Sequence, residues 1–274
     1  MKVAIQTVIY NELDEYLKPW LDYHSPMVDH IFIFEDIGSH SHKHITDKYD
    51  NVTLMSVLDI YDKENTILRL TKNKQRGGIN QGIYLRDEVL YIQSKNEYDF
   101  AFSIDIDEFI TLQEPYKQIP DVLSEFQDKD GILIQWMNYG ASRRIYKPNY
   151  DGRDYREFYT EVGEQTENDK AKLITTKICW NLNKINAWHL CGLHCMAGNW
   201  VNTIGNKDRH SIVYDKMYLK HYVTKSFEEY LWKIYIRGMH CGNRHRKIQD
   251  FFEINKDMLP MYDECMRFKE EYIK

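Results

Sequence analysis

Three carboxylates interrupt an apolar run in the stretch FSIDIDEFITL, which covers residues 102–112. They are Asp105, Asp107 and Glu108. Because an unpaired charge is costly to bury, such a run predicts a cation or a ligand close to these side chains. Side chains two residues apart on a strand share a face, so Asp105 and Asp107 would direct two carboxylates at one point. Oxygen ligands of this kind hold Mg²⁺ or Mn²⁺; the alternative is a solvated turn at the end of a strand.

The carboxylates follow one of several short apolar segments that alternate with amphipathic ones. Patterns typical of buried strands cover residues 2–9, 28–36, 51–57 and 98–105. Apolar residues at helical spacing predict helices within residues 11–24, 78–96, 226–238 and 245–274, the last one broken near Pro260. Asn11 is the predicted N-cap of the first helix, and Ser226 with Glu229 predicts a capping box. Strands that alternate with helices predict an α/β fold built on a parallel sheet.

Polar clusters stand at the ends of three of the predicted strands. They are Asn11 with Glu12, Glu35 with Asp36, and Asp105 with Asp107. In an open parallel sheet, ligands bind beyond the carboxyl ends of the strands, so the three clusters are expected to converge on one site. The stretch SHSHKH, residues 39–44, is expected to be an exposed loop and not a metal site.

Composition excludes several classes of protein. The net charge of −6, without a long basic block, argues against nucleic-acid binding. QRGG at residues 75–78 lacks the Lys-Ser/Thr that follows in a phosphate-binding loop, which disfavours ATP hydrolysis. Five cysteines without paired spacing predict reduced thiols and disfavour zinc at residues 189–195. No apolar run is long enough to span a bilayer, so a cytoplasmic protein is expected, with peripheral contact of the helical tail at the inner face of the membrane.

Five blocks, in order along residues 3–240, resemble the GT-A glycosyltransferases, and within them the family 92 and family 2-like group. The blocks are NE followed by WLDYH, then VDHIFIFED, FSIDIDEFI, WMNYGAS and LKHYVTKSFEEYLWKIYIRG. The resemblance implies a Rossmann-like, mixed and mostly parallel sheet with flanking helices and a C-terminal helical extension. It also implies a glycosyltransferase domain at residues 1–240 and the extension at residues 241–274.

The resemblance also implies roles for individual residues. The metal ligands would be Asp105, Asp107 and His221, and Asp107 would also take part in catalysis. The residues that would bind the sugar nucleotide are Asn11, Glu12, Glu35, Asp36, Gln75, Asn80, Asp105 and Lys225. Glu157 is the candidate base that would deprotonate the acceptor hydroxyl.

The sequence therefore predicts a metal-dependent enzyme that moves a hexose, with galactose favoured, from a UDP-sugar to a hydroxyl of a glycan or lipid-linked saccharide. Mn²⁺ or Mg²⁺ would be the cofactor, inversion the stereochemical course, and surface polysaccharide assembly the setting. Three alternatives stay open. A glycoside hydrolase would use the same carboxylates, a non-catalytic carbohydrate-binding module would need no metal, and a nucleotidyltransferase would need a Gly/Arg/Lys-rich loop that the sequence lacks.

Overall fold

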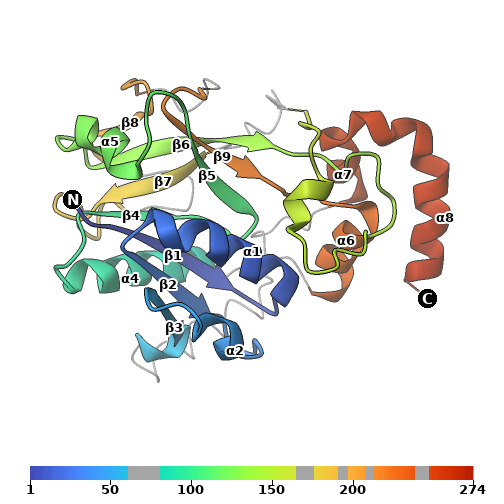
Figure 1. The fold of residues 1–274 in the computed structure, drawn as a ribbon, viewed down its shortest axis with the longest axis horizontal. Helices are drawn as coiled ribbons and strands as arrows, with labels where there is room; N and C mark the ends of the chain where they lie inside the picture. The colour runs from blue at the N-terminus through green and yellow to red at the C-terminus, as the bar shows by residue number, and fades with distance from the viewer. Residues whose placement is uncertain (61–80, 165–175, 191–196, 208–212, 238–246, 274) are drawn as a thin grey trace. The chain divides into compact units, whose positions relative to one another are not determined.

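A computed structural model of the chain describes residues 1–60, 81–164, 176–190, 197–207, 213–237 and 247–273 (Figure 1). The chain divides into two compact units. The first comprises Met1–Trp136 with Ile174–Leu219, and the second comprises Met137–Leu173 with Lys220–Lys274. This division differs from the domain boundary at residue 240 that the sequence predicts, and that boundary stays a prediction.

The described strands form one nine-stranded sheet in the order β3-β2-β1-β4-β7-β6-β9-β5, with β8 beside β6. Their bounds are β1 (Val3–Ile9), β2 (His30–Glu35), β3 (Val52–Ser56), β4 (Phe100–Ser103), β5 (Glu108–Leu112), β6 (Gly131–Asn138), β7 (Thr176–Asn181), β8 (Trp200–Asn202) and β9 (Met217–His221). The chain passes from the first unit to the second within β6 and within β9.

Strands β3, β2, β1 and β4 are parallel neighbours, and each lies within a segment that the sequence predicts as a strand. The apolar residues of β2 and β4 are buried, as are those of β1 except Val8, because both faces of such a sheet are covered. Strand β3, at the edge of the sheet, is partly buried throughout. Strand β7 runs antiparallel to β4 and β6, whereas β6 and β8 are parallel. The predicted α/β fold with a mixed, mostly parallel sheet and flanking helices is confirmed.

Helices of the first unit flank this sheet. They are α1 (Asp14–His24), α2 (Lys43–Thr46), α4 (Gln81–Ser94) and α5 (Ile119–Leu123), with single helical turns η1 (Ser25–Met27), η2 (Val57–Asp59) and η3 (Ser124–Phe126). Helix α4 packs on β1 and β4, and its buried stripe of Leu85, Val89 and Ile92 contributes to the core, as its spacing predicts. Helix α1 begins after Leu13, so the prediction that Asn11 is its N-cap is wrong.

The second unit is mainly helical. Its elements are η4 (Tyr155–Phe158), α6 (Phe227–Leu231), the π-helical turn η5 (Trp232–Ile236), α7 (Ile248–Ile254), η6 (Lys256–Met261) and α8 (Tyr262–Tyr272). The predicted capping box is confirmed, because the Ser226 hydroxyl accepts from Glu229 N and the Glu229 carboxylate accepts from Ser226 N. The predicted break near Pro260 lies in η6, between α7 and α8.

Phe227, Tyr230, Phe251 and Met258 are fully buried in the core of this unit. None of the helices in the described ranges has both the length and the apolar character that crossing a bilayer requires.

Candidate functional site

The three carboxylates of residues 102–112 lie in a tight turn between β4 and β5. Strand β4 ends at Ser103, so the expectation that Asp105 and Asp107 share a strand face is wrong. The turn is closed by two hydrogen bonds, from Asp105 N to Glu108 Oε2 at 2.9 Å and from Glu108 N to Asp105 O at 3.0 Å. Glu108 is fully buried and Asp107 is 8% exposed. Three carboxylates thus lie on one hydrogen-bonded turn, and two of them are buried. We call this turn the acid turn (residues 105–108).

Helix α1 fixes the strand that follows the acid turn. The Trp20 indole donates to the carbonyl of Glu108 at 2.9 Å, and the Tyr23 hydroxyl donates to the carbonyl of Ile110 at 2.7 Å. Ile110 N donates to Nε2 of the buried His24 at 3.2 Å. Trp20, Tyr23 and His24 belong to the WLDYH block of the sequence. The structure therefore gives that block a physical task, because it positions the strand that carries the acid turn.

A lysine that the sequence analysis did not single out lies against the acid turn. Lys177, on β7, is fully buried, and its Nζ lies 2.7 Å from Asp105 Oδ2 and 3.6 Å from Glu108 Oε1. Burial alone would lower the pKa of Lys177, but the charges of Asp105 and Glu108 outweigh it and raise that pKa above its ordinary value. Lys177 is therefore charged, and Asp105 is its principal partner.

Glu108 differs from Asp105 because it has no access to water. Burial raises the pKa of Glu108 well above its ordinary value, Lys177 opposes this rise, and the charges of Asp105 and Asp107 add to it. Two neighbouring carboxylates on one short turn are thus placed in different environments, since the Asp105 side chain is 37% exposed and that of Glu108 is not exposed at all. The acid turn does not hold three equivalent ligands.

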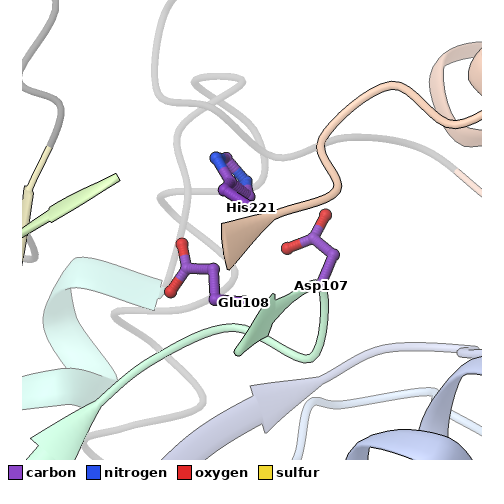
Figure 2. A group of neighbouring side chains, drawn as sticks. All are labelled: Asp107, Glu108 and His221. Carbon is purple, nitrogen blue, oxygen red and sulfur yellow. The ribbon is translucent and has the colours of Figure 1, made fainter. Parts of the chain in front are cut away.

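His221 ends β9, which is a neighbour of β5 in the sheet. One ligand atom from each of Asp107, Glu108 and His221 lies within 4.8 Å of the others, and Figure 2 shows these side chains. His221 Nδ1 donates to Asn138 Oδ1 at 3.1 Å, which directs the ring's lone pair to Nε2. Two carboxylates and an imidazole suit Mn²⁺ better than Mg²⁺, which prefers oxygen alone.

Two of the three predicted metal ligands, Asp107 and His221, belong to this group, whereas the structure places Asp105 on Lys177.

The carboxyl ends of β1 and β2 are tied to the loop at residues 39–42. Asn11 has a left-handed backbone with φ of 48°, and its Oδ1 accepts from His40 N at 3.0 Å. Glu35 Oε1 accepts from His42 N at 2.7 Å, and the His42 ring lies between Glu35 and Glu12, with Nδ1 3.0 Å from Glu35 Oε1 and Nε2 3.0 Å from the carbonyl oxygen of Glu12. The loop was expected to be exposed throughout, but His42 is fully buried.

Asp36 continues the pairing of β2 with β1, because its N–H donates to the carbonyl of Ile9 at 2.9 Å. Its own Oδ1 accepts from Ile37 N at 2.7 Å. The four predicted nucleotide-binding residues of this region therefore lie at the ends of two neighbouring strands. The side chains of Asn11 and Glu35 also accept hydrogen bonds from the loop at residues 39–42. Gln75 and Asn80, predicted to face the donor, lie outside the described residues.

Lys225 and Glu157 belong to the second unit. Lys225 is buried, has φ of 53°, and donates from Nζ to the carbonyl of Tyr222 at 3.4 Å, with its ammonium 5.0 Å from the Tyr155 ring centroid. Glu157 lies on the helical turn η4 and is exposed. Their predicted roles, in phosphate neutralisation and in acceptor deprotonation, stay predictions.

Comparison with solved structures gives likenesses at low sequence identity. No family model matches the chain, and no curated protein matches it. The crystal structure of S. aureus TarS is 16% identical with a TM-score of 0.32; the match covers 50% of this chain and 22% of TarS, so the chain spans about a fifth of that protein. Glucosyl-3-phosphoglycerate synthase from Mycobacterium tuberculosis, in complex with Mn²⁺, UDP-glucose and phosphoglyceric acid, is 12% identical, with 96% of this chain and 79% of that chain covered and a TM-score of 0.35. Both TM-scores indicate weak likenesses.

Proposed function

We propose that the chain is a metal-dependent glycosyltransferase of the GT-A type that uses a UDP-sugar as donor. The observation that carries this proposal is the buried acid turn at the carboxyl end of β4. Strands β1, β2 and β4 are parallel, so their carboxyl ends meet at one edge of the sheet, where open α/β sheets bind ligands. The polar clusters at Asn11–Glu12 and Glu35–Asp36 lie at the same edge.

Within this proposal, Asp107 is the principal ligand of a divalent cation, and Glu108 and His221 supply further donor atoms. When bound, Mn²⁺ would stabilise the negative charge of the departing nucleoside diphosphate. The protein's own contribution is positional. Helix α1 holds β5 in place, the two hydrogen bonds of the acid turn fix the backbone on either side of Asp107, and burial limits the access of water to Asp107 and Glu108.

The remaining parts of the proposal come from the resemblance of the five sequence blocks. Asn11, Glu12, Glu35 and Asp36 would form the nucleoside end of the donor site, at the ends of β1 and β2. Glu157 would deprotonate the acceptor hydroxyl in an inverting transfer. Galactose is the first donor sugar to test, and a glycan or lipid-linked saccharide is the proposed acceptor, in surface polysaccharide assembly.

The test is release of UDP from a panel of UDP-hexoses, with and without Mn²⁺. We expect slow Mn²⁺-dependent release from one donor by the wild type, lost at least about 100-fold in Asp107→Asn because a ligand of the cation is removed. Asp50→Asn, at an exposed aspartate of the same unit, is the matched control and should keep the wild-type rate. No release from any donor contradicts the proposal. Cleavage of simple glycosides without nucleotide or metal would instead favour a hydrolase.

A further inference from the structure

Lys177 is a buried cation next to the carboxylates that the proposed function assigns to metal binding. Its side chain is only 1% exposed. A buried ammonium is tolerated only when carboxylates surround it, and removing its partners leaves an uncompensated charge. Asp105 and Glu108 supply those carboxylates, at 2.7 Å and 3.6 Å from Nζ. The lysine and the acid turn are therefore one electrostatic unit.

The sheet register explains how the lysine reaches the acid turn. Strand β7 is antiparallel to β4, and Ser103, the last residue of β4, faces Ile178. Lys177 is the next residue of β7 in the direction in which β4 leads into the turn, so its side chain meets the carboxylates that follow β4. The Nζ atom also lies over the Trp136 ring, 5.9 Å from its centroid. The ring places apolar surface next to the lysine. The register of β4 and β7 therefore sets the backbone position of Lys177 next to the acid turn.

The three carboxylates of the acid turn act unequally on Lys177. The charge of Asp105 raises the pKa of Lys177 most, that of Glu108 raises it less, and that of Asp107 raises it least. Asp105 and Glu108 are also joined to each other through the two hydrogen bonds that close the turn. The geometry thus separates Asp105, the principal partner of the lysine, from Asp107, which belongs to the same turn.

We propose that Lys177 is a positioning residue of the metal site, which retains Asp105 as its principal partner and thereby makes Asp107 the aspartate that a divalent cation binds more strongly. This inference rests on the proposed function, because it concerns the same site. Its consequence is that the two aspartates of the D-x-D motif are not equivalent. The positive charge of the lysine also lowers the affinity of the site for a divalent cation, because like charges repel.

The experiment is Mn²⁺ titration of the whole protein, with free Mn²⁺ measured by electron paramagnetic resonance and neither donor nor acceptor present. Lys177→Met keeps the bulk of the side chain but removes the charge. It should bind Mn²⁺ on the order of tenfold more tightly, because a positive charge next to the carboxylates, which repels the cation, is gone. Lys177→Arg keeps the charge and should bind like the wild type. The double variant Lys177→Met with Asp105→Asn should lose most of the gain.

A second pair of variants keeps the lysine and guards against misfolding of Lys177→Met. Asp105→Asn should weaken Mn²⁺ binding far less than Asp107→Asn. Equal losses in these two variants overturn the inference, as does a Lys177→Met protein that folds and binds Mn²⁺ no more tightly than the wild type. Absence of Mn²⁺ binding in both the wild type and Lys177→Met overturns it too.

Failure of the inference and failure of the proposed function give different results. If Mn²⁺ binds with the expected ranking of variants but no UDP-hexose is turned over, the role of Lys177 stands and the transferase proposal falls. If UDP release depends on Mn²⁺ but Asp105→Asn and Asp107→Asn bind Mn²⁺ equally poorly, the transferase proposal stands and the role of Lys177 falls.

Discussion

Glu88 gives the fold a dependence on pH that can be measured without a substrate. It lies on α4 and is fully buried, and its Oε2 accepts a hydrogen bond from the Gln6 side chain on β1. Burial raises the pKa of Glu88 well above its ordinary value of 4.5; the bond from Gln6 opposes this rise, and the charges of Asp36 and Asp87 add to it. The folded state therefore binds a proton that the unfolded state releases.

The sign and size of the effect follow from this difference of one proton. Because the folded pKa lies above the unfolded one, the stabilisation is fully present below the unfolded value and is lost as the pH rises toward the folded value. The free energy of unfolding falls by about 1.4 kcal/mol per pH unit while only the folded state is protonated. Glu88→Gln is neutral in both states, so it avoids this loss.

The assay is urea unfolding of the wild type and Glu88→Gln between about pH 5.5 and 7.5. Over the part of this range in which only the folded state keeps the proton, the free energy of unfolding of the wild type should fall by about 1.4 kcal/mol per pH unit relative to the variant, since other groups titrate alike in both proteins. Glu270→Gln, at an exposed glutamate of α8, tests the loss of a surface charge alone. If the stability curves of the wild type and Glu88→Gln run parallel, Glu88 does not keep a proton in the folded state and the reasoning is refuted.

Two further expectations concern the elements that position the site and the second unit. Trp20→Phe removes the hydrogen bond from the indole to the buried carbonyl of Glu108, and it should lower the free energy of unfolding by about 1 to 3 kcal/mol in urea titrations. The same variant should bind Mn²⁺ more weakly, and unchanged binding would show that α1 does not position the acid turn. Ser226→Ala removes the cap of α6 and should cost about 1 kcal/mol, whereas Ser226→Thr, which keeps a hydroxyl that can accept from Glu229 N and donate to Glu229 Oε2, should restore most of it; equal losses in both would rule out capping as the cause.

The four parallel strands β1 to β4 were predictable from the sequence because their apolar residues stand in short, nearly continuous runs. The pattern at residues 2–9 alone indicates a buried strand, and β1 occupies Val3–Ile9. The helical spacing of Leu85, Val89 and Ile92 likewise predicted the buried face of α4. In these elements the local pattern and the global fold agree, so periodicity was sufficient.

The cap of α1 was not predictable in this way, because its competitor lies far along the chain. Asn11 is a favourable N-cap residue, but its Oδ1 accepts from the backbone of His40, 29 residues away. The helix therefore starts at Asp14 without a side-chain cap. A tertiary hydrogen bond outweighed the local preference, and no property of residues 11–24 indicates that partner.

The cluster of carboxylates in the acid turn was found from the sequence, but the different partners of these carboxylates were not. A partner for buried charge was expected, and a metal with a diphosphate was the predicted partner. The structure supplies another one in Lys177, which is 72 residues from Asp105 and meets it only through the register of β4 and β7. A signal did exist, since Lys177 is a single charge in the apolar stretch ITTKICW. Pairing it with the acid turn required the order of strands in the sheet.

The central claim is that Asp107 holds a divalent cation that in turn holds the diphosphate of a nucleotide. The measurement that tests it most directly is isothermal titration of UDP into the wild type and Asp107→Asn, with and without Mn²⁺. We expect binding of UDP by the wild type to require Mn²⁺, and affinity to fall at least about tenfold in Asp107→Asn, which corresponds to about 1.4 kcal/mol. Equal binding of UDP by both proteins regardless of Mn²⁺, or no binding by the wild type, would contradict the account.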